Sequence, residues 1–161
     1  MSSCVFPGSF DPVTRGHMDL IQRASKMFDR VTVTVMVNVN KRGALRPEER
    51  VALLEKACAH LPNVRVDRWD GLLADYMKKN GENCVLRGVR GEAEYSAERL
   101  AAATNRMLYP GMETMLMFCS ETLHGISSSA VREIAAFGGD ISSFVPGEIA
   151  EEIMERLSNK G

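Results

Sequence analysis

Short apolar segments alternate with stretches of helical periodicity along the chain, and few folds are compatible with that order. Five of the segments are rich in Val, Leu and Met and carry no alternating charges, as is typical of strands covered on both faces. We expect these strands at Ser3–Phe6, Val31–Val37, Val64–Asp67, Asn83–Leu86 and Thr114–Phe118.

Amphipathic helices are expected between and after these strands. Apolar residues at helical spacing mark the first helix, at Leu20, Ile21, Ala24, Met27 and Phe28. The second begins at Pro47, which suits a first helical position, and the third and fourth cover about residues 72–79 and 94–108. Gly138 with Gly139 ends the fifth helix, and the sixth follows Pro146.

This alternation predicts right-handed crossovers and a single Rossmann-like, doubly wound α/β domain, with a five-stranded parallel sheet and helices on both faces. A chain of 161 residues fits one domain, so we expect residues 1–161 to form it. Ligands of such folds bind beyond the carboxyl ends of the strands. The loops from strand to helix are therefore the segments in which a site is expected.

The charge balance argues against a nucleic-acid or membrane partner. Lys plus Arg number 20 against 21 Asp plus Glu, and a net charge of -1 gives no general attraction to polyanions. No apolar run approaches the roughly 20 residues of a membrane-spanning helix, and the amino terminus lacks the pattern of a secretory leader. The four cysteines, Cys4, Cys58, Cys84 and Cys119, are scattered among apolar neighbours, which indicates buried thiols in a cytoplasmic protein.

The loop after the first strand reads PGSFDPVTRGH at 7–17. We expect Pro7 and Gly8 to turn the chain, Gly8 to let a ligand approach the backbone, and Ser9 to offer a hydroxyl and an amide. His17 then lies at the start of the first helix, beside free N–H groups that attract phosphate. An ordinary turn followed by a surface histidine would use the same residue types.

Three later loops also carry groups that bind anions, although neither G-x-G-x-x-G after the first strand nor a Walker A motif occurs. NVNKRGALRPEER at 38–50 contains Lys41, Arg42 and Arg46, a run that can equally be a solvated face. LRGVRG carries Arg87 and Arg90, whose guanidiniums would repel each other unless an anion lies between them. ISSS at 126–129 places three serines at a helix start, more hydroxyls than one cap needs, although capping alone is the simpler explanation.

Together, PGSFDPVTRGH, LRGVR and GISSSAVRE resemble the phosphopantetheine adenylyltransferases of bacterial coenzyme A biosynthesis, within the nucleotidylyltransferase superfamily. The similarity reaches GGDISSFVP at 138–146, and T-x-G-H at 14–17 combined with G-[IV]-S-S-S is specific. The resemblance implies that ATP and 4′-phosphopantetheine give dephospho-coenzyme A and pyrophosphate. It also implies Mg²⁺ carried mainly by the ATP phosphates, no metal ligands on the protein, a homohexamer, and coenzyme A as a feedback inhibitor.

Motif positions imply roles for individual residues. His17, against the α-phosphate, Lys41 and Arg90 would be catalytic. Residues matching the acceptor-binding positions are Ser9, Lys41, Leu73 and Arg87. Those matching the ATP-binding positions are Ser9, Phe10, His17, Gly88, Val89, Arg90, Glu98, Leu123, His124, Gly125, Ile126, Ser127, Ser128 and Ser129.

Within the ATP set, Arg90, Ser128 and Ser129 would face the leaving pyrophosphate. The chain departs from the family pattern at Ala97, where relatives carry an aromatic residue, and at 123–125, where LHG replaces a more aromatic run. These departures affect the adenine and ribose contacts rather than the phosphate contacts.

The acceptor phosphate is already anionic, so the implied reaction needs no general base, and no Ser-His-Asp or Cys-His set is evident. We expect direct in-line attack on the α-phosphorus without a covalent intermediate.

Three alternatives compete with the hypothesis of a phosphopantetheine adenylyltransferase. They are a nucleotidylyltransferase with another acceptor, such as a cytidylyltransferase or a nicotinamide-mononucleotide adenylyltransferase; a module that senses ATP without turnover; and a fragment of a class I aminoacyl-tRNA synthetase, which the short chain and the lack of a large basic face disfavour.

Overall fold

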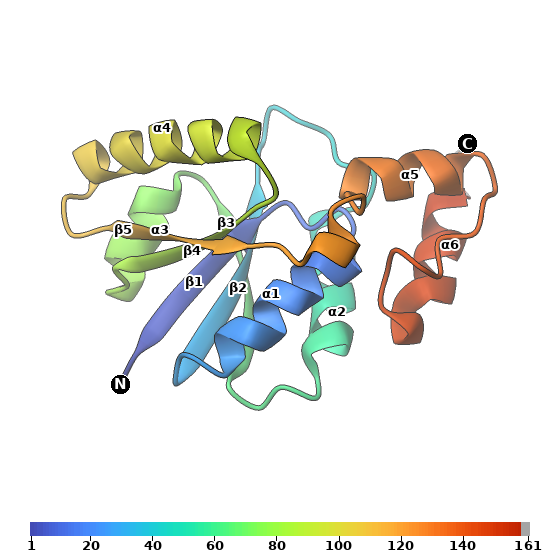
Figure 1. Ribbon diagram of the computed structural model, residues 1–161, viewed down its shortest axis with the longest axis horizontal. Helices are drawn as coiled ribbons and strands as arrows, with labels where there is room; N and C mark the ends of the chain where they lie inside the picture. The colour runs from blue at the N-terminus through green and yellow to red at the C-terminus, as the bar shows by residue number, and fades with distance from the viewer. Residues whose placement is uncertain (159–161) are drawn as a thin grey trace.

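The computed structural model describes residues 1–158, so the last three residues of the predicted domain, 159–161, lie outside the described part. It contains a five-stranded sheet in which every pairing is parallel, with the order β3-β2-β1-β4-β5 (Figure 1). The strands are β1 Ser3–Gly8, β2 Arg30–Val37, β3 Val64–Asp70, β4 Cys84–Val89 and β5 Glu113–Phe118. The predicted doubly wound α/β fold is confirmed.

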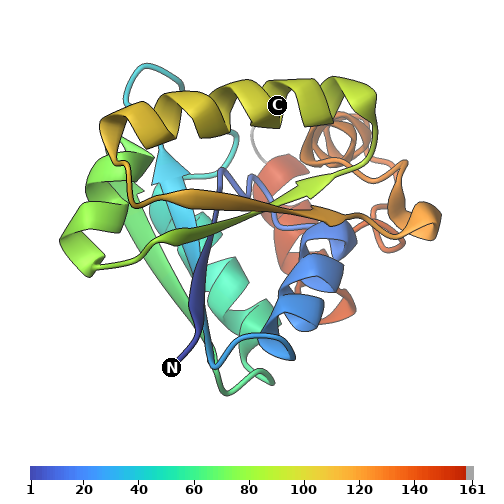
Figure 2. The same cartoon turned by 60° about the vertical axis from the view of Figure 1, so that its left-hand side comes forward.

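Helices follow the strands in regular alternation. They are α1 Arg15–Ser25, α2 Pro47–Cys58, α3 Leu73–Asn80, α4 Glu92–Leu108, α5 Ser128–Ala136 and α6 Ala150–Ser158, with short 3-10 turns η1 Glu121–Leu123 and η2 Gly147–Ile149. Figure 2 shows α4 lying across β4 and β5 on the opposite side of the sheet from α1 and α2. Both faces are therefore covered, as the alternation predicted.

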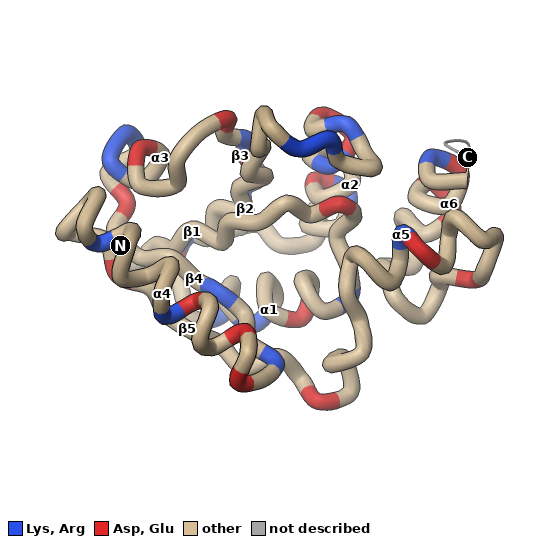
Figure 3. The backbone as a smooth tube through the Cα atoms, turned by 90° about the horizontal axis from the view of Figure 1, so that it is seen from above, with Lys and Arg blue, Asp and Glu red and all other residues tan. Residues whose placement is uncertain are grey.

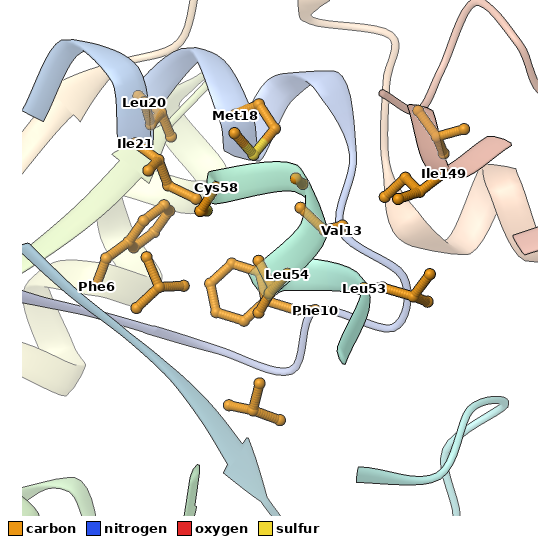
Figure 4. Packing of buried hydrophobic residues seen from close by; sticks show 14 of the residues in the cluster. Phe6, Phe10, Val13, Met18, Leu20, Ile21, Leu53, Leu54, Cys58 and Ile149 are labelled. Atoms are coloured by element: carbon orange, nitrogen blue, oxygen red, sulfur yellow. The ribbon is translucent and has the colours of Figure 1, made fainter. Parts of the chain in front are cut away.

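Two hydrophobic clusters hold these layers together. The larger one joins β1 and β2 to α1, α2, α5 and α6, and it includes Phe6, Phe10, Ile21, Leu54 and Ile149 (Figure 4). The smaller one lies on the α3 side and consists of Val5, Tyr76, Met77, Val85 and Met112. Successive residues of β1 thus point to opposite faces, and each face buries its own apolar set.

Several predicted boundaries were wrong, and each error has a local cause. The first helix ends at Ser25, and Met27, although apolar, is 58% exposed beyond its end. The fourth strand continues through Val89, so Arg87 and Gly88 lie in the strand rather than in a loop after it. The predicted left-handed cap at Gly81 is confirmed, with a φ of 66°.

The expectation that all five strands are covered on both faces was also wrong. β3 and β5 are the edges of the sheet. Charged and apolar residues alternate along β3, and Phe118 of β5 is 80% exposed. Whether a strand lies at the edge of the sheet depends on the order in which the crossover connections place the strands. The sequence of a single strand does not encode that order.

The topology determines where a site can form. The chain winds from β1 to β2 and β3 in one direction, and then returns to β4 and β5 on the other side of β1. A crevice between outgoing loops therefore opens beyond the carboxyl ends of β1 and β4, the usual ligand position in an open α/β sheet. The loops before α1 and α5 and the beginning of α4 meet there.

Candidate active site

A cavity of about 260 Å³ lies at this switch point. It contains ten of the residues that motif position assigned to ligands: Ser9, Phe10, His17, Arg87, Gly88, Arg90, Leu123, Ile126, Ser127 and Ser128. Three segments of the chain supply them, at residues 9–17, 87–90 and 123–128. We refer to this space as the first cavity.

The loop after β1 owes its shape to Phe10. Phe10 has a φ of 47°, is only 2% exposed, and packs edge-to-face on Phe6 and His17, with ring centroids 5.5 Å and 4.9 Å away. A Cβ on Gly8 would lie 3.1 Å from the Phe10 ring. Gly8 therefore leaves room for the Phe10 ring, and it also lines the first and third cavities. Pro7 and Gly8 belong to β1, so the chain turns after them rather than at them as expected.

Asp11 fastens this loop to the one after β2. Its buried carboxylate accepts hydrogen bonds from the backbone N–H groups of Ala44 and Leu45, at 2.9 Å and 2.8 Å. The guanidinium of Arg50 lies 3.8 Å from the same carboxylate and donates to the Ser9 carbonyl at 3.3 Å. Two strand-to-helix loops are thus held together below the first cavity.

His17 occupies the third position of α1 and is fixed by a reciprocal cap. Thr14 donates its backbone N–H to His17 Nδ1 at 3.0 Å, and the backbone N–H of His17 donates to Thr14 Oγ1 at 3.3 Å. Burial, together with the positive charges of Arg87 and Arg90, lowers the pKa of His17 to about 4. The ring is therefore neutral near pH 7, and with Nδ1 accepting, its proton lies on Nε2.

The arginines at the end of β4 are each paired with a carboxylate from α4. Arg87 contacts Glu98 at 2.8 Å and also donates to the Pro7 carbonyl at 2.6 Å. Arg90 contacts Glu94 at 2.6 Å, and its Nη1 donates to the Ile126 carbonyl at 3.1 Å. The expectation that these guanidiniums need an anion between them was wrong, because Glu94 and Glu98 already neutralise them.

The three serines at the start of α5 also have partners. Ser127 caps the helix by accepting from the backbone N–H of Ala130, Ser128 donates to the Pro12 carbonyl at 2.7 Å, and Ser129 Oγ accepts from Arg132. Of the three hydroxyls, only that of Ser128 donates within the described part of the chain, so the O–H groups of Ser127 and Ser129 can still donate to a ligand. Within residues 1–158, the backbone N–H groups of Ser128 and Ser129 have no hydrogen-bond partner, so the anion-binding groups here are amides.

The remaining predicted residues lie around the first cavity in three ways. Leu73 and Glu98 line a third cavity of about 310 Å³, which shares Ser9 and Arg87 with the first. Lys41 lies on an exposed turn that lines a second cavity. Val89 is buried in β4, whereas His124, Gly125 and Ser129 flank the first cavity without lining it.

Arg132 and Glu94 are among the side chains that the structure places at the first cavity and that sequence reasoning missed. Arg132 lines it and donates to the Asp11 carbonyl at 2.8 Å, and Glu94 orients Arg90. Both could have been found from spacing. Arg132 follows Ser128 by four residues on one helix, and Glu94 and Glu98 are one helical turn apart, which matches the two arginines.

Cysteine placement differs in part from expectation. Cys4 and Cys58 are buried, and burial raises their pKa to about 12 and about 11. Cys84 and Cys119 are only half-buried, and Cys119 lines the first cavity. Across residues 1–158 no three His, Cys, Asp or Glu side chains are grouped to bind a metal ion, and no helix is long and apolar enough to cross a membrane.

Comparison with known proteins agrees with this geometry. Residues 5–134 match the cytidylyltransferase-like family. A phosphopantetheine adenylyltransferase of Clostridium perfringens is 44% identical over 96% of this chain and 94% of its own, and one of Dictyoglomus thermophilum is 42% identical over 99% and 98%. The phosphopantetheine adenylyltransferase of Finegoldia magna is 40% identical over 97% of this chain and 96% of its own.

The crystal structure of a putative nicotinate-nucleotide adenylyltransferase from Vibrio parahaemolyticus has the same fold. It superposes with a TM-score of 0.67 over 96% of this chain and 99% of that one, at 19% identity. Identity of 40% or more over nearly the full length, on a fold and cavity of this kind, shows that the chain belongs to the phosphopantetheine adenylyltransferases, within the cytidylyltransferase-like family of nucleotidyltransferases.

Proposed function

We propose that the chain transfers the adenylyl group of ATP to 4′-phosphopantetheine, giving dephospho-coenzyme A and pyrophosphate. The observation that carries the proposal is the sharing of Ser9 and Arg87 by two adjoining cavities, one lined by phosphate-binding groups and one extending toward Leu73. Two phosphorylated substrates can thus meet at one point, with one in each cavity.

ATP occupies the first cavity in this proposal. The amide groups at the start of α5, with Arg90 and Arg132, bind the β- and γ-phosphates, while Leu123, Ile126 and the backbone around Gly88 contact the nucleoside. Glu98 is paired with Arg87, so it can contact ATP only if that ion pair changes. Its predicted role in ATP binding therefore requires a rearrangement of the pair.

The acceptor occupies the third cavity. Its phosphate lies between Ser9 and Arg87, with Lys41 reaching over from the loop after β2. Its pantetheine arm follows Leu73 and the small side chains Ala101 and Ala102 of α4. Arg87 is prepared for this task by Glu98 and by the Pro7 carbonyl, which fix the plane of its guanidinium.

His17 acts as a hydrogen-bond donor. Its neutral ring directs Nε2–H toward the α-phosphate, where negative charge grows as the acceptor oxygen attacks in line and pyrophosphate departs. A neutral donor cannot be titrated away above pH 6, and it does not bind the ground-state anion as strongly as an imidazolium would. No base is required, since the attacking phosphate oxygen carries no proton to remove.

Mg²⁺ enters as part of the substrate. The first cavity contains two carboxylates, and both are engaged, Asp11 by backbone amides and Glu94 by Arg90. Among the described residues, the lining of the first cavity therefore offers no carboxylate that is free to bind the ion, and in this proposal the ATP phosphates hold it.

Self-association and product inhibition belong to the same proposal. The outer surface of α4 and β5 exposes Leu100, Met107 and Phe118, at 72%, 84% and 80%, which supports assembly into the homohexamer that the family resemblance implies. Coenzyme A differs from the proposed product by one phosphate, so it can occupy the same two cavities and inhibit.

A pyrophosphate-release assay tests the proposal. ATP should give pyrophosphate with 4′-phosphopantetheine, and little with unphosphorylated pantetheine, nicotinate mononucleotide or nicotinamide mononucleotide. CTP in place of ATP should also be a poor substrate. Faster release with either mononucleotide would assign a different acceptor, and no release with any acceptor would leave only ATP binding.

A further inference from the structure

A second cavity, of about 850 Å³, adjoins the first and has a different charge. The loop between β2 and α2 forms most of its wall, and α5 and α6 complete it. Its lining includes five cationic side chains and no Asp or Glu: Lys41, Arg42, Arg46, Arg50 and Arg132. The first and third cavities each have carboxylates in their walls. Figure 3 shows the run of Lys and Arg on the segment that enters α2.

Two of these cations are neutralised within the protein. Arg46 is paired with Glu48 and Glu49, and Arg50 is buried beside Asp11. Lys41, Arg42 and Arg132 have no carboxylate partner within residues 1–158. Three uncompensated positive charges around one solvent-filled space repel each other, and a bound anion relieves that repulsion.

The second cavity is joined to the first by a shared side chain and by hydrogen bonds. Arg132 lines both cavities, and it holds the Asp11 carbonyl and Ser129 Oγ at 2.8 Å and 3.2 Å. Arg50 reaches from the second cavity to the Ser9 carbonyl at 3.3 Å. Arg132 is thus common to the two cavities, and Arg42 lines the second cavity alone.

We infer that the second cavity is a separate binding subsite for pyrophosphate, which receives the product after it leaves the first cavity. This inference rests on the proposed function, since that reaction releases pyrophosphate. Pyrophosphate fits the chemistry because it is compact and multiply charged, and its two phosphate groups can contact Arg132 and Arg42 together. The cavity lining offers no carboxylate to bind a cationic ligand.

Calorimetric titration of the full chain with pyrophosphate, without magnesium or ATP, tests the inference. We expect two binding events per chain. Arg90→Ala should weaken one of them, and Arg42→Ala should weaken the other by about tenfold. Arg42 is exposed, and its side chain makes no hydrogen bond or ion pair within residues 1–158. The variant should therefore fold, and its kcat should stay within about twofold of the wild-type value.

Arg65→Ala is the matched control, because Arg65 is an exposed arginine on β3 outside both cavities. It should leave both events unchanged. A single binding event, a second event that survives Arg42→Ala, or equal weakening by Arg65→Ala would overturn the inference. So would inorganic phosphate binding at the second event as tightly as pyrophosphate, which would mark a general phosphate site. Each of these results can occur while the release assay still shows turnover, so they are distinct from failure of the proposed function.

Discussion

The cations on the two sides of the first cavity are held in opposite ways. On the β4 side, Arg87 and Arg90 are each fixed by a carboxylate of α4 and by a backbone carbonyl. On the other side, Lys41, Arg42 and Arg132 have no carboxylate partner in the described residues. The first group has fixed geometry and little free charge, whereas the second has free charge and, for Lys41 and Arg42, little fixed geometry.

This difference suggests a division of labour. Side chains that must align reacting atoms benefit from hydrogen bonds and ion pairs that hold them in place, because a small displacement of the reacting atoms lowers the rate strongly. Groups that attract or release a multiply charged ligand need charge more than orientation. We therefore expect mutations on the β4 side to affect alignment and stability together, and mutations on the loop side to affect ligand affinity alone.

The largest effect should come from His17, which lies between the two groups. His17→Ala should lower kcat by roughly 10² to 10³, about 3 to 4 kcal/mol, by loss of one preorganised donor. His17→Gln should recover part of the rate, since an amide can also donate. The control is His60→Ala, because the one hydrogen bond of the His60 ring within residues 1–158 is to the Gln22 side chain. Retention of most of the turnover by His17→Ala would rule out the assigned role.

The next effect separates Arg87 from Lys41. Each change to Ala should raise the KM for phosphopantetheine by roughly tenfold or more, because each removes a charge-assisted bond worth about 1.5 to 3 kcal/mol. Arg87→Lys should restore only part of the loss. Only Arg87→Ala should also lower the free energy of unfolding, by roughly 1 to 2 kcal/mol, since it leaves the largely buried Glu98 unpaired. Equal stability losses in chemical denaturation would contradict the proposed difference.

A third effect is on pH dependence. The pKa of His17 is about 4 in the fold against an ordinary 6.5, so the folded state disfavours the proton. The neutral His17 ring therefore contributes to the free energy of unfolding in full above pH 6.5. This contribution decreases as the pH falls toward 4, and the loss is ~2 kcal/mol at pH 5. Denaturation at pH 7 and pH 5 should show this loss in the wild type and a smaller one in His17→Gln. If the wild type and His17→Gln lost the same free energy of unfolding, the His17 ring would be solvated and its pKa would not be lowered.

The smallest effect should come from Glu94, which we expect to act mainly by orienting Arg90. Glu94→Gln should raise the KM for ATP roughly three- to tenfold, about 1 kcal/mol, with a smaller change in the KM for phosphopantetheine. Glu94→Asp should restore part of the affinity. The matched comparison is Glu98→Gln, which should affect mainly the acceptor through Arg87. If the two variants changed the same KM, the arginines would not serve different substrates.

Much of the architecture was predictable from local patterns. Buried parallel strands need apolar runs such as 31–37, and the cap at Gly81 needs a left-handed residue. His17 was also placed correctly at the start of a helix, because Thr14 and the glycine between them leave a recognisable signature. These features depend on residues close in sequence.

The contacts that orient the site depend on residues far apart, and those were not predicted. Gly8 lines the cavities, but the sequence did not predict that the Phe10 ring also packs against it, because that packing depends on the positive φ of Phe10. The pairing of Arg87 with Glu98 and of Arg90 with Glu94 required knowing that α4 crosses above β4. A charged group can be counted in a sequence, but its partner is known only after folding.

The most direct test of the account is calorimetric binding of each substrate to Arg87→Ala and Arg90→Ala. The account predicts a crossover. Arg90→Ala should lose affinity for ATP roughly ten- to a hundredfold and keep that for phosphopantetheine, while Arg87→Ala should show the reverse. If both variants lost affinity for ATP and neither for phosphopantetheine, both arginines would belong to the triphosphate site and the division between two substrate cavities would be wrong.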